Sequence, residues 1–328
     1  MRRSLPQLRA SLNTLIARPA RSPAKPGERG FTALTAFASL ELMAREATNA
    51  VRRSSTRPRS EPRTENIASR DNRWLKLFRA ALHDGYLPEE KLIGLEGPHL
   101  VEEALRSGVA VEAFLTSPDG EKVFNAWPPQ WRRSGRDLRA PARLFESVSG
   151  TEHPQGIAAL VRPREWTFDD LLRGGAPLVV VLVGVQDPGN VGTAVRSAEA
   201  FGATGLFATK GSADPWSAKA LRASAGSALR VPILRGIAPA VAMAQLRVGG
   251  LRILAASSRQ AARSTSPDLR ESCAILVGNE GAGLSPEIEK SADGLFAIPM
   301  AAGVDSLNAG VAASVILYEA ARQRAGRG

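Results

Sequence analysis

The sequence predicts an α/β protein in which a smaller α/β domain precedes a larger domain built on a doubly wound parallel sheet. Strand-like and helix-like segments alternate with short connections from residue 65 to the C-terminus. Residues 178–183 form an uninterrupted run of aliphatic, mostly β-branched side chains, which is typical of a strand buried on both faces of a parallel sheet. The length of 328 residues suits two domains better than one.

Residues 1–64 differ in composition from the rest, being rich in Arg, Ser, Pro and Ala and poor in acids. Only residues 31–50 resemble a short helix. We expect a basic, disordered extension. It either adds non-specific affinity for RNA or has no function because translation begins downstream. An organelle transit peptide is a third and weaker interpretation.

The smaller domain is expected to span residues 65–162 and to bind RNA. Basic side chains on its first helix, such as Arg73 and Lys76, either contact RNA or form a solvated helix face, and the second outcome is the more common. Residues 163–176 are expected to be a linker. The periodicity predicts helices at 72–81 and 98–106 and strands at 92–97, 111–116, 142–145 and 156–161.

The larger domain is expected to span residues 177–328. Asn190 is a plausible N-cap for its first helix, and Gly202 is a plausible residue just beyond that helix. The sequence predicts strands at 178–183, 206–208, 252–256, 273–277 and 295–298, and helices at 191–201, 218–223, 240–246, 286–291 and 307–322.

Composition narrows the class of protein. The formal net charge is +11 and the pI is about 10.7, so nucleic acid is the default partner, although an arginine-rich genome also gives such a charge. One cysteine, Cys273, and three scattered histidines provide neither a disulfide framework nor a metal site. No apolar run is long enough to span a bilayer. We expect a cytoplasmic protein, with organelle import as a minor alternative.

Three loops follow predicted strands of the larger domain, at residues 187–192, 278–285 and 299–308. They are rich in glycine and small polar residues, which allow a backbone to approach a ligand closely. Ligands of such sheets bind outside the carboxyl ends of the strands. Each loop alone is as compatible with an ordinary turn, but three of them together indicate a ligand site.

These loops resemble the three motifs of the SpoU/TrmH family of RNA 2′-O-methyltransferases, within the SPOUT superfamily. The matching segments are 190–196 (NVGTAVR), 275–284 (ILVGNEGAGL), and 298–300 (IPM) followed by 306–314 (SLNAGVAAS). They occur in the family's order and spacing. The resemblance covers residues 176–324, and residues 65–162 more weakly resemble the family's N-terminal RNA-binding domain. Many relatives have Val-Ser where this chain has Ala309 and Gly310.

The resemblance implies a deep trefoil knot in the C-terminal domain, a homodimer formed through the knotted region, and S-adenosylmethionine held in a bent shape. Knots are rare exceptions to ordinary chain topology. The residues implied to bind the cofactor are Gly278, Ile298 and Leu307 through their backbones, with Met300, Glu280 and Gly281 beside it.

The implied chemistry is an in-line displacement, in which a ribose 2′-oxygen attacks the sulfonium methyl group. By resemblance, the catalytic residues are Arg196, Asn190, Glu280, Ser306 and Asn308. Arginine is effectively always protonated, so Arg196 is better suited to hold a phosphate and stabilise the developing alkoxide than to act as the base. The structural alternatives are a solvated helix arginine, an N-cap at Asn190 and caps of the last helix at Ser306 and Asn308.

The sequence therefore predicts an S-adenosylmethionine-dependent RNA methyltransferase that acts on a ribose 2′-hydroxyl, with large-subunit rRNA favoured over tRNA. The alternatives are a tRNA 2′-O-methyltransferase and a non-catalytic RNA- or ribosome-binding factor. A nucleotide-dependent oxidoreductase lacks support, because no G-x-G-x-x-G follows the first strand of the larger domain and no P-loop lysine pattern occurs.

Overall fold

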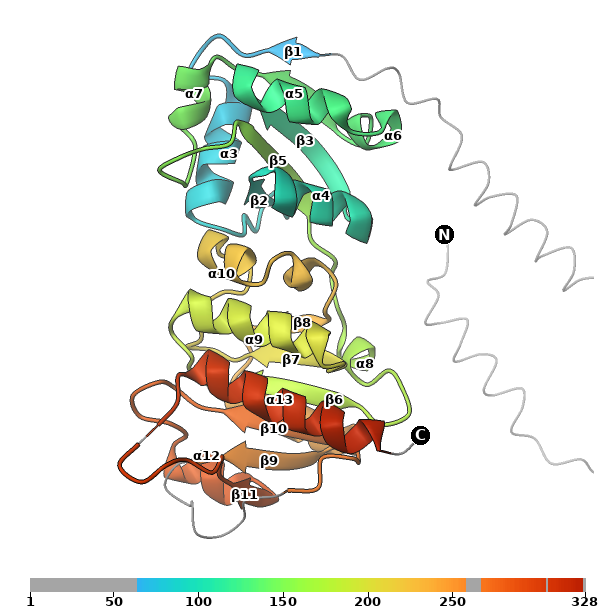
Figure 1. Cartoon of the computed structure of the whole chain (residues 1–328), viewed down its shortest axis with the longest axis vertical. Helices are drawn as coiled ribbons and strands as arrows, with labels where there is room; N and C mark the ends of the chain where they lie inside the picture. The colour runs from blue at the N-terminus through green and yellow to red at the C-terminus, as the bar shows by residue number, and fades with distance from the viewer. Residues whose placement is uncertain (1–63, 258–266, 305, 327–328) are drawn as a thin grey trace, which may run out of the picture. The chain divides into compact units, whose positions relative to one another are not determined.

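The computed structural model describes residues 64–257, 267–304 and 306–326, arranged around two separate sheets (Figure 1). The expected basic extension and its candidate helix at 31–50 lie outside the described residues. The described residues belong to one compact unit. No helix in the described ranges is both long and apolar enough to cross a membrane.

The first sheet is mixed and has five strands. β5 pairs antiparallel with both β2 and β3, whereas β4 pairs parallel with β3 and β1. The strands lie in the order β1 (Glu65–Asn66), β4 (Arg136–Arg139), β3 (Ala110–Thr116), β5 (Ile157–Arg162) and β2 (Ile93–Glu96).

Helices cover both faces of this sheet. Leu75 and Phe78 of α3 are buried against one face, and Phe124 of α5 is buried with the other. The side chain of Asn72 caps α3 by accepting a hydrogen bond from the Trp74 amide at 2.8 Å. The helices are α3 (Arg73–His83), α4 (Pro98–Ser107), α5 (Pro118–Ala126), α6 (Pro129–Arg132) and α7 (Ala142–Glu146).

One strand prediction in this region was wrong. Residues 142–145 form helix α7 instead of a strand, and the strand of this stretch, β4, ends at Arg139. A short apolar run such as Leu144-Phe145 does not distinguish helix from strand by periodicity. Pro141 directly precedes the helix. The expected linker also contains a short helix, α8 (Phe168–Leu171).

The second sheet has six strands, and every pair in it is parallel, as the buried run at 178–183 predicted. All five residues of β6 are buried. The strand order departs from the chain order because β10 lies between β9 and β6. The order is β11 (Gly294–Phe296), β9 (Arg252–Ala256), β10 (Cys273–Val277), β6 (Leu178–Leu182), β7 (Gly205–Ala208) and β8 (Ile233–Arg235).

The side chains of β6 alternate between two apolar layers. Leu178 and Val180 pack with α9 and α13 on one face, which lies toward the viewer in Figure 1. Val179 and Val181 pack with α8 and α11 on the other face. The helices of this domain are α9 (Pro188–Ala200), α10 (Ala218–Ala223), α11 (Pro239–Val248), α12 (Pro286–Ser291) and α13 (Ala309–Ala325), with a 3₁₀ turn, η1 (Ser227–Leu229).

The N-cap of α9 is Asp187, so the prediction that Asn190 caps this helix was wrong. The Asp187 carboxylate accepts a hydrogen bond from the Gly189 amide at 2.8 Å, and Pro188 opens the helix. Proline is favoured in the first helical turn, which shifts the start of the helix toward the N-terminus. Asn190 is therefore a buried residue within the first turn.

A cluster of charged side chains joins the two sheet regions through η1. The guanidinium of Arg230, just after η1, lies 2.6 Å from a Glu103 carboxylate oxygen on α4 and 2.5 Å from Glu199 on α9. All three side chains are largely shielded from solvent. Hydrogen bonds between charged groups that are partly buried are stronger than neutral ones, so Arg230 holds α4, η1 and α9 together.

Close packing of α9 on α10 depends on Gly192, and this gives a first prediction. A Cβ atom at Gly192 would lie 2.4 Å from the Ala220 carbonyl oxygen and 2.6 Å from the Ala223 Cβ. We expect Gly192→Ala to lower the free energy of unfolding by about 1–3 kcal/mol, because the added methyl group forces α9 and α10 apart. The measurement is chemical denaturation.

Gly175→Ala is the matched control, since nothing lies within 4 Å of a Cβ there. We expect the control to be neutral or to stabilise by up to about 1 kcal/mol. Equal stability of the two variants would contradict the packing argument.

Candidate functional site

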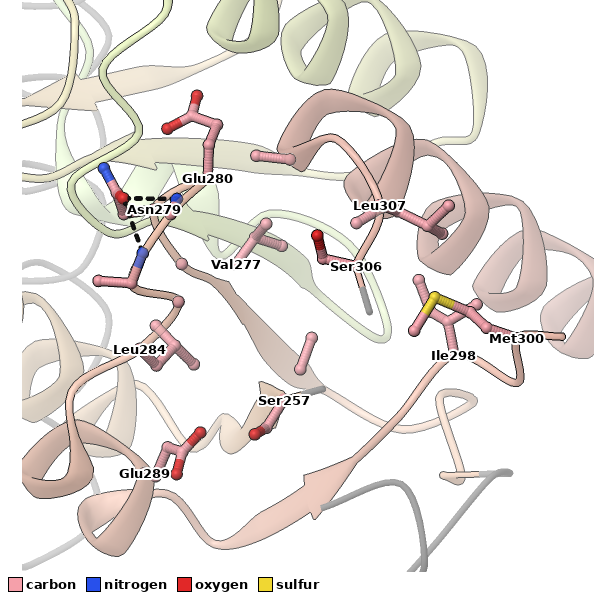
Figure 2. Close-up of a pocket in the computed structure, with 17 residues that line it drawn as sticks. Ser257, Val277, Asn279, Glu280, Leu284, Glu289, Ile298, Met300, Ser306 and Leu307 are labelled. Atoms are coloured by element: carbon pink, nitrogen blue, oxygen red, sulfur yellow. Dashed lines mark hydrogen bonds between the residues drawn. The ribbon is translucent and has the colours of Figure 1, made fainter. Parts of the chain in front are cut away.

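A cavity of about 290 Å³ lies at the carboxyl ends of β9 and β10, between the chain segments that precede α12 and α13 (Figure 2). The predicted loops at 278–285 and 299–308 both contribute to its lining. The cavity is lined by all six residues implied to bind the cofactor, namely Gly278, Glu280, Gly281, Ile298, Met300 and Leu307.

Asn279 shapes the loop between β10 and the cavity. Its side-chain oxygen accepts hydrogen bonds from the amides of Gly281 at 2.9 Å and Ala282 at 3.1 Å (Figure 2). Its side-chain nitrogen donates to the Gly184 carbonyl at 2.9 Å. One amide side chain therefore closes the loop and ties it to the chain that leaves β6.

Gly278 lies where two backbone segments meet. A Cβ atom at this position would lie 2.4 Å from the Gly283 carbonyl carbon and 2.5 Å from the Leu284 nitrogen. Only glycine allows that approach without moving the loop. The rim of the cavity is thus formed by backbone groups, which suits a ligand recognised through peptide N–H and C=O groups.

The opposite wall of the cavity is apolar. Ile298, Met300 and Leu307 lie together on one side of it, and the Ser306 hydroxyl points into the space between them and Glu280 (Figure 2). An apolar wall facing a polar backbone rim is the usual composition of a cofactor site.

Glu280 is the charged group that joins this cavity to α9. Its carboxylate accepts a hydrogen bond from the Asn190 side-chain amide at 2.7 Å, and the amides of Gln186 and Asp187 lie 3.4 Å from it. Burial raises the pKa of Glu280, but the hydrogen bonds from Asn190 and from backbone amides outweigh it and hold the pKa below its usual value. Glu280 is therefore ionised at neutral pH.

The start of α9 carries a second ion pair. The Lys219 ammonium on α10 lies 2.8 Å from the Asp187 carboxylate. That contact, together with the Gly189 amide, lowers the pKa of Asp187. Asp187 thereby fixes the turn that leads from β6 into α9 and so positions Asn190.

The third predicted loop ends at the N-terminus of α13. The Asn308 side chain caps this helix by accepting from the Val311 amide at 3.2 Å, while its neighbours Leu307 and Ala309 line the cavity. Gly310 packs directly on α9, since a Cβ there would lie 3.0 Å from the Thr193 Cβ. The small residues in this motif therefore permit α13 to approach α9.

Arg196 does not line the cavity. It lies on an exposed face of α9, six residues after Asn190, and within the described ranges it has no hydrogen bond or ion pair. A spacing of six residues turns a side chain about 240° around a helix, so Asn190 and Arg196 cannot face the same site from one chain. Of the five residues predicted to be catalytic, Glu280 and Ser306 line the cavity, and Asn190 and Asn308 border it.

Two polar residues of the cavity were not predicted from the sequence. Ser257 follows β9, and Glu289 lies on α12 with its carboxylate directed toward Ser257 (Figure 2). Neither belongs to a glycine-rich loop. The only available signal was the position of Ser257 at the carboxyl end of a predicted strand.

A metal centre has no support in the part of the chain that the structure describes, where no group of three His, Cys, Asp or Glu side chains is placed to hold an ion. The single cysteine, Cys273, is buried in β10, and burial raises the pKa of its thiol. A protonated, enclosed thiol is neither a metal ligand nor a nucleophile.

Comparisons with known proteins identify the family of the chain. A family model described as the SpoU rRNA Methylase family matches residues 177–318, and one described as an MRM3-like substrate binding domain matches residues 88–159. The chain is 32% identical over 224 residues to the 23S rRNA (guanosine(2553)-2′-O)-methyltransferase RlmP of Bacillus subtilis, covering 68% of this chain and 86% of that protein. This chain belongs to the SpoU rRNA methylase family.

Two further SpoU-family relatives are informative. The chain is 35% identical over 204 residues to a 23S rRNA (guanosine-2′-O-)-methyltransferase, RlmB, of Xanthomonas campestris, covering 60% of this chain and 82% of that protein. The SpoU methyltransferase AviRb of Streptomyces viridochromogenes, solved in complex with AdoMet, is similar in structure, with a TM-score of 0.67 and 27% identity. That match covers 77% of this chain and 98% of AviRb.

The hydrogen-bonded Glu280 gives a second prediction. Because its pKa is lowered in the folded chain, its contribution to stability is present above the unfolded pKa of about 4.3 and is lost as the pH falls through the folded value. We expect Glu280→Gln to destabilise by about 1 kcal/mol at pH 7. The difference from wild type should narrow as the pH falls below that unfolded value.

The measurement is denaturation from pH 3 to 8. The control is Glu146→Gln at an exposed glutamate of α7, for which we expect a change within about 0.5 kcal/mol. A gap between Glu280→Gln and wild type that persists at the lowest pH would show that the carboxylate's charge is not the cause.

Proposed function

We propose that this chain transfers a methyl group from S-adenosylmethionine to a ribose 2′-hydroxyl of large-subunit rRNA. The observation that carries the proposal is the convergence of the loops after β6, β10 and β11 around one cavity: the second and third line it, and the first reaches it through the bond between Asn190 and Glu280. Membership of the SpoU family and the 23S rRNA specificity of the relatives supply the reaction and the substrate class.

The cavity suits the proposed cofactor. Gly278, Ile298 and Leu307 would hold it through their backbone groups, and the side chains of Met300 and Leu307 would give it an apolar surface, since all four residues line the cavity. Glu280 and Gly281 lie at the same rim, and the ionised Glu280 suits a positively charged ligand. When bound, S-adenosylmethionine supplies an electrophilic methyl group on a positively charged sulfur.

The residues of this chain then have to position the ribose and stabilise charge on its 2′-oxygen. Glu280 is a weak base because its pKa is lowered, so its role is to orient Asn190 by their hydrogen bond. Ser306 and Asn308 border the opposite side and position the substrate. Arg196 supplies the permanent positive charge that holds a substrate phosphate and stabilises the developing alkoxide.

Arg196 would reach such a site in a homodimer. Val311, Val315 and Tyr318 form an exposed apolar stripe on α13, with 44%, 40% and 56% of their surfaces accessible. The neighbours Ser197 and Ser314 are hydrogen-bonded at 2.6 Å, so Arg196 lies close to this stripe. We propose that a second copy docks on the stripe and brings Arg196 of one copy to the cavity of the other.

The proposal also covers the knot, the role of the smaller domain and the cellular location of the enzyme. The insertion of β10 between β9 and β6, followed by the return of α13 onto α9, supports the trefoil knot expected of the family. The smaller domain, within which the MRM3-like substrate binding match falls, would bind the RNA. We place the enzyme in the cytoplasm.

The catalytic role of Arg196 gives the third prediction. We expect Arg196→Ala to lower the rate of methyl transfer by about 10²–10³-fold, because it removes one group that stabilises the transition state, while the affinity for S-adenosylmethionine stays unchanged. The assay follows labelled methyl groups into unmodified total RNA, with mapping of the labelled fragment.

Arg270→Ala, at an exposed arginine paired with Asp268, is the control and should retain full activity. If the label appears in tRNA and not in large-subunit rRNA, the substrate is tRNA and the proposed substrate is wrong. Wild-type binding to RNA without any transfer would favour a non-catalytic RNA-binding factor.

The apolar stripe gives the fourth prediction. We expect Val315→Asp to convert a dimer to a monomer and to reduce methyl transfer together with it, because a buried unpaired carboxylate is costly at an interface. The measurement is sedimentation combined with the transfer assay. Val241→Asp, at a valine on α11 that is 49% exposed, should leave both unchanged. A monomeric wild type, or a fully active monomeric variant, would contradict the shared site.

A further inference from the structure

A second hollow, separate from the cofactor cavity, lies beside the edge strand β8. Its volume is about 570 Å³. The segment 162–166 at the end of β5 forms one side, and the chain around Tyr86 and Lys91 forms another. β8 is the last strand at its end of the sheet, and Ile233 and Trp216 are buried beneath the hollow. Neither the proposed cofactor nor the proposed reaction uses it.

Two guanidinium groups in the lining of this hollow lie over aromatic rings. The Arg235 guanidinium lies 4.4 Å from the centre of the Tyr86 ring, and the Arg164 guanidinium lies 5.7 Å from that of Trp166. Planar groups of both kinds are surfaces on which unpaired RNA bases stack.

Contacts with Asp214 hold the Arg235 side chain in place. Its guanidinium lies 2.6 Å from one oxygen of Asp214, and the other oxygen of Asp214 accepts from the Trp216 amide at 2.9 Å. This series of contacts fixes the guanidinium over Tyr86. A stacking surface that is already ordered loses little conformational entropy when a ligand binds.

The lining carries four basic side chains and one acid. Three of the four have carboxylate partners: Lys91 with Glu165, Arg162 with Glu112, and Arg235 with Asp214. Arg164 donates to the Ser107 carbonyl and has no carboxylate partner among the described residues. Arg164 therefore carries an uncompensated positive charge beside an aromatic ring. Such a pair suits a nucleotide, with the guanidinium at its phosphate and the ring against its base.

A further unmet group belongs to the same lining. The indole nitrogen of Trp166 is buried and has no hydrogen-bond partner in the described part of the chain. Buried donors are normally paired, and this one is an exception. The stacking surfaces and the uncompensated guanidinium of Arg164 together describe a site for a nucleotide.

We infer that this hollow binds an unpaired nucleotide of the RNA substrate, with its base against Tyr86, Arg235 and Trp166 and its phosphate at Arg164. The inference rests on the proposed function, because it assigns the hollow to the same RNA. Bases in a paired helix are covered by their neighbours, so the hollow selects a single-stranded segment that flanks the methylated nucleotide.

The test is fluorescence anisotropy of the full chain with labelled oligouridine of roughly ten nucleotides and with a paired RNA of equal length. We expect Trp166→Ala and Arg235→Ala to weaken oligouridine binding by roughly 5- to 150-fold, the range for loss of one stacked base. Trp166→Phe, which keeps a ring and removes the N–H, should lose less than Trp166→Ala. Binding of paired RNA should change by less than about twofold.

Arg270→Gln is the charge-matched control and should behave as wild type. In the methyl-transfer assay, the hollow variants should raise KM for the RNA and leave kcat and the affinity for S-adenosylmethionine unchanged. Thermal unfolding verifies that each variant is folded.

Equal weakening by Arg270→Gln, or equal loss for paired and unpaired RNA, would overturn the inference in favour of general electrostatic attraction. Unchanged binding in folded Trp166 and Arg235 variants would also overturn it. Absence of methyl transfer by the wild-type chain would contradict the proposed function only. The comparison of oligouridine binding by wild type and the hollow variants would still show whether the hollow binds RNA.

Discussion

The site depends on the parallel pairing of β6 with β10. This pairing aligns Leu182 with Val277, so the loops that leave these two strands emerge side by side although they are about ninety residues apart in the chain. Two side-chain bonds then join the loops, from Asn279 to the Gly184 carbonyl and from Asn190 to Glu280. The shape of the cavity and the position of α9 both follow from this pairing.

The cavity and the hollow differ in the charge of their linings. The cavity at the carboxyl ends of the strands contains the ionised Glu280 and an apolar wall, which suits a cationic cofactor with a flat ring. The hollow beside β8 is basic and aromatic, which suits RNA. The cluster of charged side chains around Arg230 connects α4 of the smaller domain with η1 and α9 of the larger one. The surfaces proposed for RNA binding and for methyl transfer therefore lie on elements that are bonded to one another.

Local sequence patterns predicted most of the fold. The strands at 252–256 and 273–277 and the helices at 218–223 and 286–291 have the predicted bounds, because a buried strand or a capped helix is visible in a short window. The short run at 142–145 was assigned wrongly because four residues do not establish a period. The sequence patterns did not predict α5 and β4 of the smaller domain.

The sequence by itself determined the three glycine-rich loops at strand ends, because such turns are local features, and the resemblance of these loops to a family implied six residues that line the cavity. Only the tertiary structure decided that Asn190 pairs with Glu280 instead of capping α9, that Ser257 and Glu289 join the cavity, and that Arg196 faces away from it. It also decided that Tyr86, Trp166 and Arg235 line one hollow. These outcomes depend on contacts between distant segments, and such contacts are set by strand order and helix packing, which no short window of sequence contains.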